Sequence, residues 1–137
     1  MTAPRPIALH VHLGYRDAPA ALDWLQRVLG AEVTMHWPDD DGGVLHAELR
    51  VGDAAFVVFT DPGHTPPVRR GDTSGQGVFF SVPDETTVDA AFARATAAGA
   101  EVVWPPGGTE WGNHRTRFVD PEGREWTVGT HRPGERA

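Results

Sequence analysis

The sequence of 137 residues contains no cysteine and no lysine. Without cysteine, the chain can form no disulfide, hold no thiolate-bound metal and use no cysteine nucleophile. Arginine supplies all 12 basic residues against 19 acidic ones, which leaves a formal net charge of −7. Nucleic-acid phosphates and anionic lipids repel such a chain. We therefore expect no nucleic-acid or membrane partner, and a cationic or neutral small ligand is favoured.

Long apolar runs are missing as well. No stretch approaches the ~20 apolar residues of a membrane-spanning helix, and residues 1–6 do not lead into the apolar segment of a signal peptide. Together with the lack of cysteine, this predicts a soluble, cytoplasmic protein. Because 137 residues suffice to bury one core, we predict a single domain over residues 1–137.

The first half of the chain is typical of a strand, a helix and three further strands. Residues 7–13 alternate apolar and polar side chains, which places His10 and His12 on one face of a strand. Asp17 is a helix cap, and apolar residues follow at helical spacing until Gly30. Three strand-like runs separated by turn-forming residues follow at 32–37, 44–51 and 54–60.

The same order of elements restarts after a connector. Residues 61–75 are rich in proline, glycine, threonine and aspartate, and we interpret them as an exposed linker. A strand is predicted at 77–82, and a helix begins at Asp84 and ends at Gly99. Further strands are predicted at 102–104, 114–119 and 125–130, with a glycine-rich loop at 105–113.

An internal duplication supports this division. LGAEV at 29–33 recurs as AGAEV at 98–102, each time between a helix and a strand. We therefore predict an α+β fold of two repeated βαβββ modules, at about 7–60 and 76–131, which form a cupped mixed sheet.

The motifs along the chain resemble those of the vicinal oxygen chelate superfamily, which includes glyoxalase I, bleomycin-resistance proteins and extradiol dioxygenases. The resemblance covers nearly the whole chain and implies two modules around a ligand-binding cup, usually in a dimer. It is carried by RDAPAALDWLQRVLGAEV at 16–33, HAELRVGD at 46–53, AAGAEVV at 97–103, WG at 111–112 and DPEGREW at 120–126.

The resemblance also specifies where a metal would bind. Metal-dependent members carry His and Glu ligands at four inward positions, on the first and fourth strands of each half. The corresponding residues here are His10, Val58, Gly77 and Thr127. A catalytic cation needs about three protein ligands, so we expect no metal and no other cofactor. Displaced ligands would be required for a metal site, and strand alternation offers His12, His46, Glu48 and Glu125.

The chain has five tryptophans, more than a small core requires. We interpret Trp24 and Trp126 as structural, and Trp37, Trp104 and Trp111 as walls of a pocket for a flat ligand, with Trp111 the first candidate. Members of the superfamily often carry an arginine two places after the WG pair, where this chain has His114, followed by Arg115.

Polar contacts to the ligand are predicted from His10, His46 and Glu48, although the same residues also suit a packed histidine and a solvated strand face. An apolar centre is predicted from the side chains that share the inward parity of the expected metal positions, which are Phe56, Val58, Phe79 and Thr127.

Our first hypothesis is a non-catalytic, metal-independent homodimer of bleomycin-resistance type that sequesters an aromatic natural-product antibiotic. The alternative is an enzyme, either a lyase, isomerase or dioxygenase with displaced metal ligands, or a cofactor-free enzyme with His10, His46 or Glu48 as general base. A third possibility, a structural partner without a small ligand, requires a cup filled by the protein's own side chains.

Overall fold

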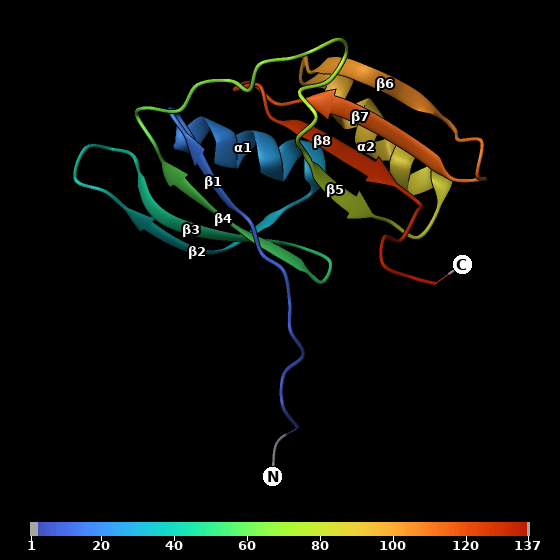
Figure 1. Ribbon diagram of the computed structural model, residues 1–137. Helices are drawn as coiled ribbons and strands as arrows, with labels where there is room; N and C mark the ends of the chain where they lie inside the picture. The colour runs from blue at the N-terminus through green and yellow to red at the C-terminus, as the bar shows by residue number, and fades with distance from the viewer. Residues whose placement is uncertain (1–2, 137) are drawn as a thin grey trace.

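The computed structural model of the chain describes residues 3–136 and divides them into two modules (Figure 1). The first module contains β1 (His12–Tyr15), α1 (Ala18–Leu29), β2 (Glu32–Pro38), β3 (Val44–Val51) and β4 (Ala54–Thr60). The second contains β5 (Val78–Ser81), α2 (Glu85–Ala97), β6 (Glu101–Gly108), β7 (His114–Val119) and β8 (Glu125–Gly129).

Each module forms a four-stranded mixed sheet. The strand orders are β1-β4-β3-β2 and β5-β8-β7-β6. The first strand of each module lies parallel to its last strand, and the remaining pairs are antiparallel. This repeated topology confirms the predicted α+β fold of two βαβββ modules.

Both helices begin at capping aspartates, and α1 also ends at a capping glycine. The Asp17 side chain accepts a hydrogen bond from Ala20 N at 3.1 Å, and Gly30 ends α1 in the left-handed conformation, with φ 68°. Asp84 caps α2 in the same way. No helix in residues 3–136 is long and apolar enough to cross a membrane.

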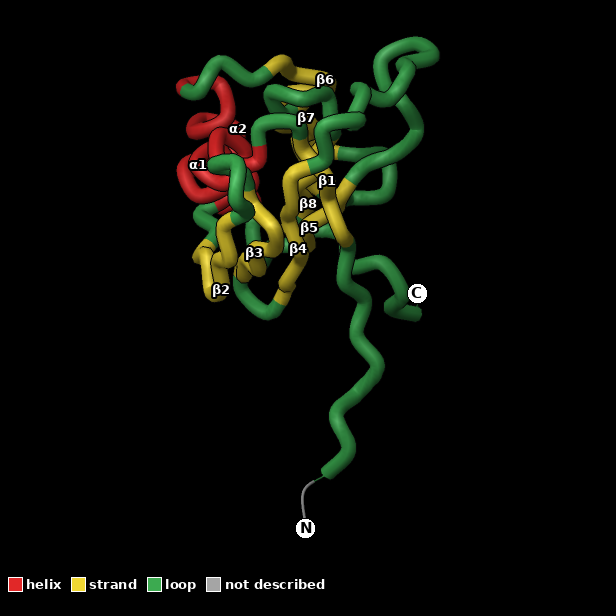
Figure 2. Tube along the Cα trace, turned by 90° about the vertical axis from the view of Figure 1, so that its left-hand side faces the viewer, coloured by secondary structure: helices red, strands yellow, loops and turns green. Residues whose placement is uncertain are grey.

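One hydrophobic core connects the two modules. The helices lie side by side behind both sheets (Figures 1 and 2). Trp126 of β8 stacks on Phe80 at 5.9 Å between ring centroids, and its ring lies 5.7 Å from that of Phe56 in β4. Trp24 from α1 lies 6.4 Å from Trp126, and both tryptophans are buried, which confirms their structural role.

The DPEG turn of the second module holds the first module at the start of α1. Asp120 accepts hydrogen bonds from the Tyr15 hydroxyl at 2.6 Å and from Trp126 Nε1 at 3.0 Å. The Glu122 carboxylate accepts a hydrogen bond from Arg16 N at 2.7 Å. Asp120 and Glu122 therefore fasten the modules together.

The first strand is shorter than the sequence pattern predicts. A strand was expected over 7–13, but β1 begins at His12, and the last backbone bond before it runs from Val57 N to Val11 O at 2.9 Å. In this register Ala54, the first residue of β4, lies opposite Leu9, so β4 has no residue to pair with the chain upstream of Leu9. Residues 3–8 extend away from the body (Figures 1 and 2), and Ile7 and Leu9 are exposed.

Strand β6 is longer than predicted, because it continues through Pro105 and Pro106 to Gly108. A glycine-rich loop was expected from residue 105. β6 lies at the edge of its sheet, where a proline without an N–H group need not interrupt a ladder hydrogen bond.

The connector between the modules, residues 61–77 in the structure, contains no helix or strand, but it is not simply exposed. His64 is buried, and Thr73 and Ser74 are half-buried against the second sheet. The second sheet is therefore partly covered by the protein's own chain.

Candidate functional site

The pairing of β4 decides which side chains leave the core. His12 lies opposite Val57, so Val57 and not Val58 shares the face of the histidines. Val58 is fully buried beneath the helix layer, and Phe56 is 3 % exposed. The prediction that Phe56 and Val58 share the inward, ligand-facing parity is therefore wrong by one residue of strand register, although Phe56 also borders the hollow described next.

The open face of the first sheet carries a hollow of about 560 Å³, here called the first-sheet hollow. His46 Nε2 donates to Glu48 Oε2 at 2.8 Å, and the Trp37 ring lies 5.6 Å from the His46 ring. The hollow is bordered by His10, His12, Thr34, His46, Glu48 and Arg50. The structure thus gathers the predicted histidines and Glu48 on one face, with Trp37 beside them.

These groups do not form the four-ligand metal site that the resemblance implies for metal-dependent members. Of the four expected ligand positions, Val58 is buried in the core and Gly77 has no side chain. The Thr127 hydroxyl accepts a hydrogen bond from Arg117 Nη1 at 2.9 Å, and His10 Nδ1 donates to Ala55 O at 2.9 Å. Within residues 3–136, no three His, Asp or Glu side chains are grouped so that they could hold a metal ion.

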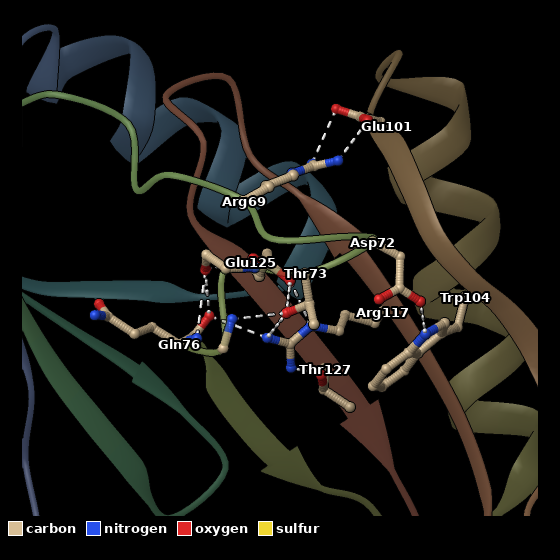
Figure 3. A network of polar contacts seen from close by, with 11 residues as sticks. Arg69, Asp72, Thr73, Gln76, Glu101, Trp104, Arg117, Glu125 and Thr127 are labelled. Carbon is tan, nitrogen blue, oxygen red and sulfur yellow. Dashed lines mark hydrogen bonds and ion pairs between the residues drawn. The ribbon is translucent and has the colours of Figure 1, made fainter.

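Glu125, a displaced-ligand candidate, is committed to the second sheet and the connector (Figure 3). Its Oε1 accepts hydrogen bonds from Thr73 Oγ1 at 2.6 Å and Arg117 Nε at 2.8 Å. Its Oε2 accepts from Ser74 N at 2.7 Å and Ser74 Oγ at 2.6 Å. Both carboxylate oxygens therefore already have two donors each.

The protonation of Glu125 follows from these contacts. Burial by itself raises the pKa of this carboxyl, but the hydrogen bonds from Ser74, Thr73 and Arg117 outweigh burial and lower the pKa to about 2. The side chain has no exposed surface. Glu125 is thus a permanently charged structural group at neutral pH.

The open face of the second sheet is aromatic. The Arg115 guanidinium carbon lies 4.1 Å from the centre of the Trp104 ring and 5.7 Å from that of Trp111. A Cβ at Gly129 would lie 3.0 Å from Phe79 Cζ and 3.2 Å from Arg115 Cβ, so the phenyl ring and the arginine stem are neighbours across this glycine. We call Phe79, Trp104, Trp111 and Arg115 the aromatic shelf.

The predicted ligand residues therefore fall into two sets. Phe79, Trp104 and Trp111 meet on the aromatic shelf, whereas Trp37 lies with His46 on the other sheet. Thr127 is on the shelf side of β8 but is 2 % exposed. Which of these residues contact a ligand stays a prediction.

Arg117 is the residue that sequence reasoning missed. It lies two residues after Arg115 on β7, so both side chains point to the same face of the sheet. Arg117 lies opposite Thr127 in the strand register, and its guanidinium carbon is 5.3 Å from the centre of the Trp104 ring. The alternation of β7 could have placed Arg117 on the same face as Arg115. The contacts of Arg117 with the connector could not be predicted from the sequence.

Comparison with known proteins agrees with this architecture. An uncharacterized protein of Mycobacterium bovis is 31% identical over 127 residues, which cover 89% of this chain and 82% of that protein. TioX from Micromonospora sp. ML1 is 30% identical in sequence, and its crystal structure has a TM-score of 0.69 over 93% of this chain and 100% of that one.

A fosfomycin resistance protein, FosX from Listeria monocytogenes, has a TM-score of 0.73 over 98% of this chain and 100% of its own, but only 16% identity, so this likeness concerns the fold alone. The model of one protein family matches residues 7–128, nearly the whole chain. The resemblance seen in the motifs is thereby confirmed, and the chain belongs to the Glyoxalase/Bleomycin resistance protein/Dioxygenase superfamily.

Proposed function

We propose that the protein is a metal-independent binding protein that sequesters a flat aromatic molecule on the aromatic shelf. The observation that carries this proposal is the clustering of Phe79, Trp104 and Trp111 around Arg115 on an open sheet face. Phe79 is 39% exposed and Trp111 64% exposed. Large apolar side chains gathered in this way are typical of a binding surface.

The energetics suit capture of a ring system. Stacking on an indole contributes ~1 kcal/mol beyond the apolar area that it buries. Each Å² of that buried area contributes roughly 25 cal/mol more. Sequestration requires affinity alone, so it needs no metal and no catalytic group. A natural-product antibiotic with a flat aromatic group is the ligand class that we propose, and resistance by binding is then the role.

The test is tryptophan fluorescence quenching with a panel of polycyclic and glycopeptide antibiotics, followed by calorimetry on each compound that quenches. Trp111→Ala should weaken binding roughly tenfold or more, because it removes one of the three aromatic side chains of the shelf. Trp37→Ala is the matched control, since Trp37 is also exposed but lies on the other sheet. A compound that binds both variants equally, or a panel without any quenching, would contradict the proposal.

We also propose that the protein acts as a cytoplasmic homodimer. Ile7 and Leu9 on the N-terminal arm are fully or almost fully exposed, at 104% and 89%. A symmetric partner that covers this arm and the free edges of β1 and β5 would remove them from water. Light scattering at micromolar concentration should give the mass of two chains, and the mass of one chain would count against this proposal.

A second candidate function is favoured by the His46–Glu48 pair. A carboxylate 2.8 Å from an imidazole nitrogen fixes the orientation of the ring, as in sites of general-base catalysis. Mass spectrometry of each ligand after long incubation separates the two functions. An unchanged ligand supports sequestration. A product that forms with the native protein but not with His46→Gln supports the enzyme.

A further inference from the structure

Arg115 differs from the other arginines that are half-buried in the structure. Arg69 pairs with Glu101, Arg117 with Glu125, and the Arg124 side chain donates to a backbone carbonyl. The hydrogen bonds and ion pairs of residues 3–136 include none from the Arg115 side chain. Its charge is therefore partly removed from water without a partner of opposite sign.

Two indole rings hold this charge in place. Trp104 and Trp111 attract the guanidinium through their ring faces, at 4.1 Å and 5.7 Å. A ring face offers no lone pair in the plane of the guanidinium, so its N–H groups keep their capacity to donate. The shelf thus presents an oriented donor between aromatic walls.

The neighbouring charged groups do not take this role. Arg117 donates from all three of its side-chain nitrogens, to partners that include Glu125, Thr127 and Thr73. Asp72 accepts from Trp104 Nε1 at 3.2 Å and forms no ion pair with Arg115 within the described residues. Within the described residues, the charged side chain of the shelf, Arg115, has no ion-pair partner and no hydrogen-bond acceptor.

We propose that Arg115 selects anionic aromatic ligands. A flat ring that carries a carboxylate stacks against Trp111, and the carboxylate accepts the N–H groups of Arg115 in a charge-assisted, two-point contact. This inference rests on the proposed function, because it takes the aromatic shelf as the binding surface. The proposed preference for an anion is the opposite of the preference for a cationic ligand that the net charge of −7 suggests. Net charge acts through a screened field over the whole surface, whereas selection depends on the group in contact.

The test uses three probes with the same ring and different charge: 2-naphthoate, neutral 2-naphthamide and 2-naphthylmethylammonium. Calorimetry on the native protein should show the carboxylate binding at least about tenfold more tightly than the ammonium. In Arg115→Gln the ratio of the carboxylate affinity to the ammonium affinity should fall close to one, while the affinity for the neutral amide changes little. Arg27→Gln on the surface of α1 removes the same charge from a distant place and should leave the ratio intact.

The three probes separate the two levels of the proposal. If none of them binds the native protein, both the shelf and its charge selection are overturned. If the amide binds but the carboxylate is not preferred, or if Arg115→Gln weakens all three equally, only the role of Arg115 is overturned. Arg115→Lys provides a second variant that should retain only part of the preference for the carboxylate, because the positive charge remains but the two-point contact is lost.

Discussion

Glu125 shows how one buried carboxylate can organise a whole region. It receives hydrogen bonds from the connector at Thr73 and Ser74, and it pairs with Arg117 of the sheet. A charge without exposed surface is tolerated only with such compensation. The same contacts keep the connector on the second sheet, next to the aromatic shelf.

Removing this charge should be costly. Glu125→Gln leaves the buried Arg117 charge unpaired and turns an amide N–H group towards existing donors, so the free energy of unfolding should fall by roughly 3 kcal/mol. Urea denaturation followed by circular dichroism measures this loss. Glu101→Gln breaks the more exposed ion pair with Arg69 and should cost less than about 1 kcal/mol. Equal losses in the two variants would contradict the structural role of Glu125.

The pKa of Glu125 also predicts a pH dependence. In the folded protein the pKa is lowered to about 2 from an ordinary value of 4.5, so the unfolded chain takes up a proton first as the pH falls. The stabilisation is therefore complete above pH 4.5 and is lost between pH 4.5 and about 2. Denaturation curves across this range should converge for the native protein and Glu125→Gln. A constant difference between them would show that Glu125 does not titrate as described.

At the scale of elements, the duplicated modules carry different chemistry at equivalent places. Glu48 on β3 lies opposite Val57, and Arg117 on β7 lies opposite Thr127. The first module consequently presents a histidine–carboxylate pair at a place where the second presents arginines among indoles. One topology thus supports an open polar hollow on one sheet and an aromatic shelf on the other.

The two helices also contribute unequally to the core. α1 buries seven of its residues and α2 only three. Trp24 of α1 contacts aromatic rings of the second module, with its ring 6.1 Å from that of Phe118. α1 therefore belongs to the core of both modules.

Trp24→Ala should consequently lower the free energy of unfolding by roughly 3–5 kcal/mol, the usual cost of truncating a buried aromatic side chain. Chemical denaturation monitored by far-UV circular dichroism gives the value. Phe92→Ala on α2 is the control, because Phe92 is only half-buried and should cost clearly less. A loss below about 1 kcal/mol for Trp24→Ala would show that α1 does not join the modules as described.

At the scale of the whole molecule, the modules are joined through buried polar contacts as well as through the core. Burial and the nearby Asp120 raise the pKa of Tyr15 well above its ordinary value, so its hydroxyl remains a donor to Asp120. Trp126 Nε1 donates to the same carboxylate oxygen. The family motif at 120–126 thus serves the assembly of the two modules.

Asp120→Ala should destabilise the protein by roughly 2–4 kcal/mol, because it leaves the hydroxyl of Tyr15 and the N–H of Trp126 buried without an acceptor. Thermal unfolding should still show one transition, at a lower temperature. Asp53→Ala, at a fully exposed turn position, should change the free energy of unfolding by no more than about 0.5 kcal/mol. A native-like melting temperature for Asp120→Ala would refute this account of the module interface.

The sequence by itself determined the elements and their repetition. Caps such as Asp17, Asp84 and Gly30, the alternation of the strands and the LGAEV repeat are local signals, written within a few residues of the structure that they specify. The resemblance to the superfamily and the structural roles of Trp24 and Trp126 were accessible for the same reason.

Only the tertiary structure decided what each face carries. Val58 turned inward because β1 pairs His12 with Val57, 45 residues away in sequence, and β1 itself begins only at His12. The arginines at 115 and 117 look alike in sequence, yet only the second finds a carboxylate within hydrogen-bonding distance. Such choices depend on partners that are distant along the chain, and register and pairing are set only when the sheets and the connector pack together.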